Sequence, residues 1–480
     1  MRWPTSMAAA FAVPLLLWTT AAGVGGVSAQ PRRSDPPNIV LLISDDEDYE
    51  HFGFMGSRVA RTPTLDRLAE GGTVFPNAYV PAPLCRPSLA SLLSGKLPQQ
   101  HGIYNNYIER DGISNPSGGL DTITLGPMNS LPNKLKSAGY STFASGKFWE
   151  GDPRRMGFTD GTVEITYEGF GRFVRQGQDE LFSFIDTQRK NNKPMFIWWA
   201  PMLPHRPHTP PARLLEQFKD VEIPVPSHVP AERAAAYVEG MRSFYAMGTW
   251  FDEGVGSLVE KLRQAGELER TIFLFWIDNG DTLGSLSKNS PYEKGVRTPM
   301  FVSRPGHAPS RKRIEGLHYA LDLHATALDY AGVAVTPGIA SRSLRPLIEG
   351  RSQEPSHDTI FGGVFAHHAY RYAGDTPRSP ARDLFALYGR SDRWKFVLYT
   401  QDVGPNNQQY IGIPLRLAEM PIRKAGDMEL YDLNADPYER RNLAAEPANR
   451  RRLATFRRQA LEWWQKTAGS PGPLALPAGR

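Results

Sequence analysis

Side chains with metal-binding or catalytic potential lie at or just beyond the ends of apolar runs at four places in the sequence. They are Asp45 and Asp46 after residues 38–44, Lys147 after residues 140–145, His205 after residues 194–200, and Asp278 with Asn279 after residues 271–277. Carboxylate and amide oxygens are the ligands that Ca²⁺ and Mg²⁺ prefer, whereas thiolate and imidazole clusters favour zinc. No histidine directly follows Asp278. The pattern therefore favours one hard cation over a two-zinc phosphatase site.

Cys85 is the only cysteine of the 480 residues, so no intrachain disulfide forms. It lies in residues 83–95, where Pro87 suits the first position of a helix and Gly95 the position just past its end. We therefore expect Cys85 at a helix N-terminus, where backbone N–H groups and the helix dipole stabilise an anion and lower a thiol pKa. The alternative is a buried cysteine without a chemical role.

The elements that position these residues predict an α/β fold. The runs at 38–44, 194–200 and 271–277 are continuously apolar, as in strands buried on both faces of a parallel sheet, with a weaker run at 140–145. Helical patterns at 64–71, 130–138 and 231–265 alternate with them. Because ligands bind at the carboxyl ends of parallel strands, the polar side chains should meet at one edge of a mostly parallel sheet flanked by helices.

The character of the sequence changes near residue 350. Short strand patterns at 359–365, 394–399 and 428–433 precede a helical pattern at 446–466 and a Pro- and Gly-rich tail. We predict a catalytic domain over residues 30–350 and a smaller α+β domain over residues 351–480 that ends in a disordered tail.

The N-terminus has the features of a signal peptide. Arg2 precedes the apolar residues 7–18, and Val27-Ser28-Ala29 is suited to cleavage, so residues 1–29 are expected to be removed on export to the periplasm or the exterior. An uncleaved anchor helix is the alternative, but Thr and Gly residues interrupt the run. After cleavage no integral membrane segment is expected. The net charge of +5 is small for this length and does not indicate a nucleic-acid partner.

The segment around Cys85 resembles the sulfatase signature, with Cys85, Pro87, Ser88, Leu93, Ser94 and Gly95 in register. Other segments resemble sulfatases in the same order along nearly the whole mature chain. They are NIVLLISDD, RTPTLDRLAEGGTVFPNAY, AGYSTFASGK, LPHRPHTPP, WIDNG, SPYEKGVRTP and ELYDLNADPYERRNL. The chain is therefore identified as resembling the formylglycine-dependent sulfatases of the alkaline phosphatase superfamily.

The resemblance implies a role for each matching residue. A formylglycine-generating enzyme would convert Cys85 to formylglycine, whose hydrate supplies the nucleophilic hydroxyl and a second hydroxyl that later expels sulfate. Asp45, Asp46, Asp278, Asn279 and the modified Cys85 would bind one Ca²⁺. Lys147 would neutralise sulfate oxygens, and His205 and Lys288 would assist the leaving alcohol of a sulfate ester such as a sulfated carbohydrate. Positive groups around the transferred sulfate are what this cleavage requires.

Three residues depart from the sulfatase pattern. Leu89 replaces the arginine of the signature, which also forms part of the recognition pattern of the formylglycine-generating enzyme. Trp149 replaces a histidine that contacts the nucleophile, and Lys294 replaces a glycine. Loss of one cation should cost about 2–4 kcal/mol of transition-state stabilisation unless another group replaces it.

Two nearby residues are candidates for that replacement, Arg86 and His101, although we expect Arg86 to be a surface residue. His208, three residues after His205, is a further candidate polar contact in the pocket.

Two alternatives to a sulfatase remain open at this point. The single-metal ligand set also fits a phosphonate or phosphodiester hydrolase of the same superfamily. Leu89 and Trp149 would also fit a catalytically impaired homologue that binds sulfated glycans. Retention of Cys85 together with the metal-binding and cationic residues argues for the hydrolase, because a binding module need not keep a nucleophile.

Overall fold

The structure is a computed structural model. It describes residues 36–106, 108–110, 113–115, 130–162, 178–226, 229–283, 286–309, 311–365, 384–403, 422–468, 474 and 476. The predicted signal peptide and most of the predicted disordered tail lie outside these residues, and the proposed boundary at residue 350 stays a prediction. None of the helices within the described residues combines the length and the apolar character needed to cross a bilayer.

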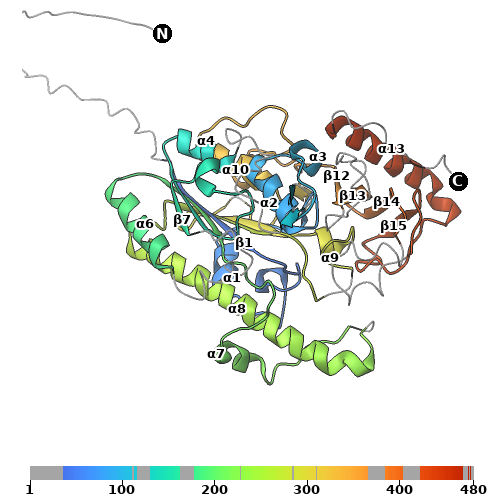
Figure 1. The fold of residues 1–480 in the computed structure, drawn as a ribbon, viewed down its shortest axis with the longest axis horizontal. Helices are drawn as coiled ribbons and strands as arrows, with labels where there is room; N and C mark the ends of the chain where they lie inside the picture. The colour runs from blue at the N-terminus through green and yellow to red at the C-terminus, as the bar shows by residue number, and fades with distance from the viewer. Residues whose placement is uncertain are drawn as a thin grey trace, which may run out of the picture. The chain divides into compact units, whose positions relative to one another are not determined.

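The centre of the molecule is a seven-stranded, mostly parallel sheet, as predicted (Figure 1). In spatial order its strands are β2 (Gly72–Phe75), β10 (Met300–Ser303), β9 (Thr271–Ile277), β1 (Asn38–Ser44), β8 (Met195–Ala200), β6 (Ser141–Gly146) and β7 (Asp160–Thr162). The five strands from β9 to β7 are parallel to one another, whereas β10 is antiparallel to both of its neighbours. The sequence analysis did not identify β10, β2 or β7.

Alternate residues of the central strands enter two separate apolar cores. In β1, Ile39, Leu41 and Ile43 join one core, and Val40 and Leu42 join the other. Helices α2 (Cys85–Ser94), α4 (Leu131–Ser137) and α10 (Asp322–Tyr330) cover the first face of the sheet, and α1 (Pro63–Glu70), α6 (Asp179–Lys190) and α8 (Ala234–Gln264) cover the second (Figure 1). Burial on both faces explains why these strands are continuously apolar.

A second sheet of four antiparallel strands lies toward the C-terminus. Its order is β12 (Thr359–Phe365), β13 (Leu384–Ser391), β14 (Trp394–Tyr399) and β15 (Met428–Asp432). Helix α13 (Arg450–Thr467) packs Leu453, Phe456, Ala460 and Trp464 against one face of this sheet. The smaller α+β unit predicted after residue 350 is present, although the sequence analysis missed β13.

The remaining elements are short and mainly connect or flank the two sheets. They are η1 (Gly53–Met55), β3 (Ala78–Tyr79), α3 (Pro98–His101), β4 (Ile108–Arg110), β5 (Ile113–Asn115), η3 (Pro153–Met156), α7 (Ala212–Leu215), η4 (Glu216–Phe218), η5 (Ala231–Arg233), α9 (Glu293–Val296), β11 (His318–Tyr319), α11 (Arg345–Ile348) and η7 (Pro447–Asn449).

Candidate active site

The four strand ends singled out in the sequence meet at one edge of the central sheet, because β9, β1, β8 and β6 are adjacent and parallel. Lys147 Nζ donates to Asp45 Oδ1 at 2.6 Å and to Asp278 Oδ2 at 2.9 Å. His205 Nε2 lies 3.5 Å from Asp46 Oδ2. All five side chains are buried. The structure thus brings together residues that are more than 230 positions apart.

Two backbone features hold these groups in place. Asp46 has a left-handed φ of +59°, uncommon for a residue with a side chain, and its N–H donates to Asp278 Oδ1 at 3.1 Å. Gly146, just before Lys147, has a φ of +83°, and a Cβ there would lie 2.0 Å from the carbonyl oxygen of Ala200. Only glycine therefore fits at the end of β6, where the chain turns to present the lysine.

Cys85 begins α2 and projects into the same cluster. Its Sγ lies 3.0 Å from Lys288 Nζ and 3.8 Å from Asp46 Oδ1, and Lys288 Nζ also donates to Asp46 Oδ1. Burial of Cys85, which is 1% exposed, raises the pKa of its thiol to about 11, although Lys147 and Lys288 oppose this shift. The unmodified residue is therefore a neutral thiol at neutral pH.

Two expectations about this helix are wrong. The helix dipole was expected to lower the Cys85 pKa, but desolvation and the neighbouring carboxylates Asp46 and Asp278 outweigh the favourable charges. Pro87 was expected at the first helical position, but α2 begins at Cys85, two residues earlier. Proline is accommodated because the N–H groups of the first turn have no partners within the helix. Gly95 follows the helix in the left-handed region, as predicted.

The donor atoms of the cluster fit a divalent cation. Three buried oxygens, Asp45 Oδ2, Asp46 Oδ2 and Asn279 Oδ1, accept no hydrogen bond in the described part of the chain. His205 Nε2 lies 3.5 Å from Asp46 Oδ2, and Asn279 directs its Nδ2 to Asp46 Oδ1 at 2.7 Å. The metal-ligating atoms of Asp45, Asp46, Cys85 and His205 all lie within 4.8 Å of one another. Orphaned buried oxygens are costly, and a hard cation would satisfy them.

The charges of the cluster point to the same ion. Burial raises the pKa of Asp45 and of Asp278, whereas Lys288, His205 and Lys147 outweigh burial and lower the pKa of Asp46. Burial also lowers the pKa of His205 to about 4, so its ring is neutral at neutral pH. Three carboxylates face two ammonium groups, and a doubly charged cation would turn this net negative charge into a net positive one. A positive cluster is suited to an anionic substrate.

Apolar side chains occupy two of the positions that depart from the sulfatase pattern, and neither nearby candidate cation replaces the lost charge. Leu89 and Trp149 are buried in the same apolar core as Cys85. Arg86 is buried, not at the surface as expected, because its Nε and Nη2 donate to Glu150 at 2.9 and 3.1 Å. Burial, with Arg86 nearby, lowers the pKa of His101 to about 3. Neither candidate therefore supplies the missing cation to the cluster: Arg86 is neutralised and His101 is uncharged.

The Arg86–Glu150 pair should be a large determinant of stability. Replacing Arg86→Met leaves the Glu150 carboxylate, which is 3% exposed, without its cation, and should lower the free energy of unfolding by about 3–5 kcal/mol in urea titrations. The matched control is Arg86→Met with Glu150→Met, which removes both charges and should recover most of the loss. Equal losses in the single and double variants would contradict this account.

Lys294 forms a second charged cluster next to the first. Its Nζ donates to Asp48 Oδ2 at 2.5 Å and to Glu50 Oε2 at 2.9 Å, and Asp48, His51 and Asp281 lie within 4.8 Å of one another. Lys294 is among the departures from the sulfatase pattern in the sequence, but its carboxylate partners were not predicted. The acidic run after β1 could have indicated these partners, since a buried carboxylate such as Asp48 requires a nearby cation.

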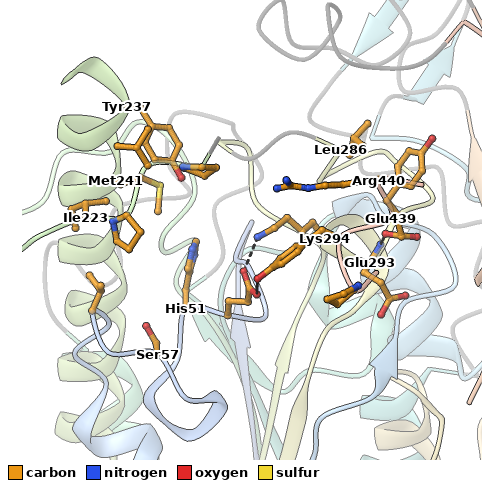
Figure 2. A pocket seen from close by; sticks show the side chains of 18 of the residues that line it. His51, Ser57, Ile223, Tyr237, Met241, Leu286, Glu293, Lys294, Glu439 and Arg440 are labelled. Atoms are coloured by element: carbon orange, nitrogen blue, oxygen red, sulfur yellow. Dashed lines mark hydrogen bonds and ion pairs between the residues drawn. The ribbon is translucent and has the colours of Figure 1, made fainter. Parts of the chain in front are cut away.

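A cavity of about 1090 Å³ opens beside this second cluster. Figure 2 shows Arg440 and Lys294 reaching into the space between α8, which carries Tyr237, and the loop that contains Glu439. His51 and Leu286 also line it, and they belong to the loops that carry Asp46 and Lys288. The cavity therefore lies on the same loops as the candidate catalytic residues. His208 packs edge-on against Phe244, with the ring centroids 5.2 Å apart.

Comparison with known proteins identifies the family. A family model described as Sulfatase matches residues 37–333, more than half of the chain. The chain belongs to the sulfatase family. A second model, described as N-sulphoglucosamine sulphohydrolase, C-terminal, matches residues 283–408 of this sulfatase. The protein is accordingly a sulfuric ester hydrolase, as the signature around Cys85 indicated.

Individual sulfatases are similar over most of the chain. Human N-sulphoglucosamine sulphohydrolase is 27% identical over 91% of both chains. N-acetylgalactosamine-6-sulfatase of Sus scrofa is 30% identical over 68% of both chains. A structure solved in complex with its substrate, D-glucosamine-2-N,6-O-disulfate, shares the fold with a TM-score of 0.71, 20% identity, and coverage of 92% of this chain and 99% of that one.

Proposed function

We propose that this sulfatase is an exported enzyme that removes sulfate from a sulfated amino sugar. The observation that carries the proposal is the position of Cys85 Sγ, 3.0 Å from Lys288 Nζ inside a buried cluster of carboxylates and lysines. The names of three similar proteins support the substrate class, since each refers to a sulfated or sulfo-substituted hexosamine. The cavity of about 1090 Å³ is not lined by Cys85, Lys147, His205 or Lys288, but it lies on the neighbouring loops and has room for the sugar part of a substrate.

In this proposal Asp45, Asp46, Asp278 and Asn279, with the modified Cys85, hold one Ca²⁺. When bound, the ion supplies positive charge for the sulfate oxygens and acidifies the hydroxyl of the modified residue. The proposed modification is formylglycine, which supplies a hydrated aldehyde in place of the thiol. A neutral Cys85 thiol with a pKa of about 11 supports the view that the unmodified residue is not the nucleophile.

The other residues of the cluster have separate tasks in the proposal. Lys147 carries an ammonium group held by Asp45 and Asp278, and it contributes positive charge toward a bound sulfate. Lys288 keeps an ammonium group beside Cys85, because Asp46 outweighs the effect of burial and raises the lysine pKa. His205 donates from Nδ1 to the Arg206 carbonyl at 2.7 Å, which orients Nε2 toward the cluster as a proton acceptor. Once Nε2 has taken up a proton, it can pass that proton to the leaving oxygen.

A comparison of substrates tests this function. We expect kcat/KM for a sulfated glucosamine to exceed that for a phosphodiester or phosphonate of similar leaving group by at least ~100-fold. Equal or faster cleavage of the phosphorus compounds would favour the other hydrolase class of this superfamily. Failure to cleave any sulfate ester, with Cys85 fully converted, would favour a binding role.

The mass of the tryptic peptide that contains Cys85 tests the modification. Conversion replaces sulfur and two hydrogens by one oxygen, so the modified peptide is lighter than the cysteine form. We expect the lighter peptide after export from a host with a formylglycine-generating enzyme. A wholly unmodified peptide from an active preparation would overturn the proposed nucleophile.

A further inference from the structure

The C-terminal helix α13 carries an unusual concentration of positive charge. Its buried apolar residues pack against the four-stranded sheet, so its polar residues lie on the opposite face. The helix contains five arginines and one lysine against a single glutamate: Arg450, Arg451, Arg452, Arg457, Arg458, Lys466 and Glu462. No acidic residue lies in its first turn, where the helix dipole adds further positive charge. This end of the molecule is therefore suited to an anionic partner.

A cavity of about 440 Å³ lies between this helix and the edge of the sheet. Its titratable lining residues are Arg451 and Arg452, from the first turn of α13. Thr455 and Gln459, one and two turns further along, contribute a hydroxyl and an amide. Thr359 and Ser391, which pair across β12 and β13, add two more hydroxyl groups. The described lining combines guanidinium groups with neutral hydrogen-bond donors and includes no carboxylate.

The two arginines of the cavity are not neutralised by carboxylates. Arg452 stacks with its guanidinium carbon 3.8 Å from the centroid of the Trp394 ring, and its Nη1 donates to Asn449 Oδ1 at 2.5 Å. Arg451 is exposed and forms no ion pair in the described part of the protein. Neighbouring Arg393, in contrast, is paired with Asp432. The stacked Arg452 is therefore fixed in place, and no carboxylate of the described residues pairs with Arg451.

We propose that this cavity is a second binding site, separate from the Cys85 cluster, for a sulfate group of a long sulfated polysaccharide. The choice of ligand rests on the proposed function, since a polymer cleaved at one position carries further sulfates along its chain. Guanidinium groups bind such tetrahedral oxyanions by paired N–H donors, and the hydroxyls suit the sugar. The site holds the polymer, while hydrolysis takes place at Cys85.

The surroundings favour a sulfated glycan over single-stranded nucleic acid. Proteins that bind single strands offer open aromatic rings on which bases stack. Trp394, the ring beside the cavity, has Arg452 at 3.8 Å and Arg393 at 4.9 Å from its centroid. Because two guanidinium groups already lie against this ring, it offers no platform for a base.

The experiment measures binding of a fluorescent heparin decasaccharide to the full-length Cys85→Ala protein, in which the proposed nucleophile is absent. Arg451→Glu should weaken binding at least ~10-fold at low salt and reduce the salt dependence of the dissociation constant. The matched control is Arg189→Glu, the same charge change at an exposed arginine in the last turn of α6. This control should change binding less than ~3-fold. Arg451→Gln repeats the test if Arg451→Glu lowers the melting temperature.

Activity measurements separate this site from the catalytic one. With Cys85 intact, Arg451→Gln should leave the hydrolysis of a small aryl sulfate unchanged and raise KM for the polymer. Equal effects of Arg451→Glu and Arg189→Glu, or no effect of either, would overturn the proposal. So would single-stranded DNA of matched charge binding as tightly as heparin in an Arg451-dependent manner. Arg451-dependent heparin binding by a protein that hydrolyses no sulfated sugar would reject the proposed function and retain this site.

Discussion

Replacing Cys85→Ala is expected to reduce kcat/KM for a sulfate ester by at least ~10⁴-fold, the largest effect we predict for any substitution. Cys85 starts α2, is 1% exposed, and directs its sulfur to Lys288 and Asp46. Alanine removes the group from which the proposed nucleophile is made and leaves the surrounding charges unchanged. Steady-state kinetics on an aryl sulfate, with the melting temperature as a check of folding, measure the effect.

Cys85→Ser is the matched control for this prediction. Serine keeps a hydroxyl of similar size but lacks the second hydroxyl that expels sulfate from the hydrated aldehyde. We therefore expect Cys85→Ser to transfer sulfate to itself at most once and to show no turnover. Full hydrolysis by either variant would contradict the role given to Cys85.

Removal of the divalent cation is expected to have the second largest effect. Chelation should lower the hydrolysis rate by at least ~100-fold, since both the positive charge for sulfate and the acidified hydroxyl depend on it. Added Ca²⁺ should also raise the melting temperature, because Asp45 Oδ2, Asp46 Oδ2 and Asn279 Oδ1 gain a partner. At 100 times the dissociation constant the gain is about 2.7 kcal/mol, which corresponds to several degrees.

Asp46→Asn should abolish this response to Ca²⁺, because it removes one ligand charge from the centre of the cluster. The control is Asp186→Asn, the same change at a half-exposed residue on α6 that pairs with Lys261. It should leave the Ca²⁺-dependent shift intact. A shift of the same size in Asp46→Asn would place the cation elsewhere, and a shift with Mg²⁺ but not Ca²⁺ would change the identity of the ion.

Much of the central sheet was predictable because its strands carry a strong local signal. The runs at 38–44 and 271–277 are continuously apolar, and the strands β1 and β9 have the same limits as these runs. Parallel strands then require their carboxyl ends to lie together, which brought Asp46 near Asp278 without any knowledge of the tertiary structure. The catalytic roles of these residues stay predictions.

The remaining features depend on pairing between distant residues, which a single sequence does not specify. β10 is antiparallel to its neighbours, and nothing local to residues 300–303 indicates that direction. Arg86 was predicted to be a surface residue, because its partner Glu150 lies 64 positions away and the sequence does not indicate that the two pair. The prediction of a lowered Cys85 pKa was wrong for the same reason. A helix N-terminus can be recognised in the sequence, whereas complete burial of the thiol cannot.

The burial of Cys85 restricts when it can be modified. In the folded protein its side chain, on the first residue of α2, is 1% exposed, so another enzyme could not bring its own active site to the sulfur. Any enzyme that modifies Cys85 must act while residues 83–95 are still an extended peptide. If Cys85 is modified as proposed, folding and modification compete in time, and a chain that folds first keeps its thiol. The fraction of active protein would then depend on the rate of folding during synthesis as well as on the sequence that the modifying enzyme recognises.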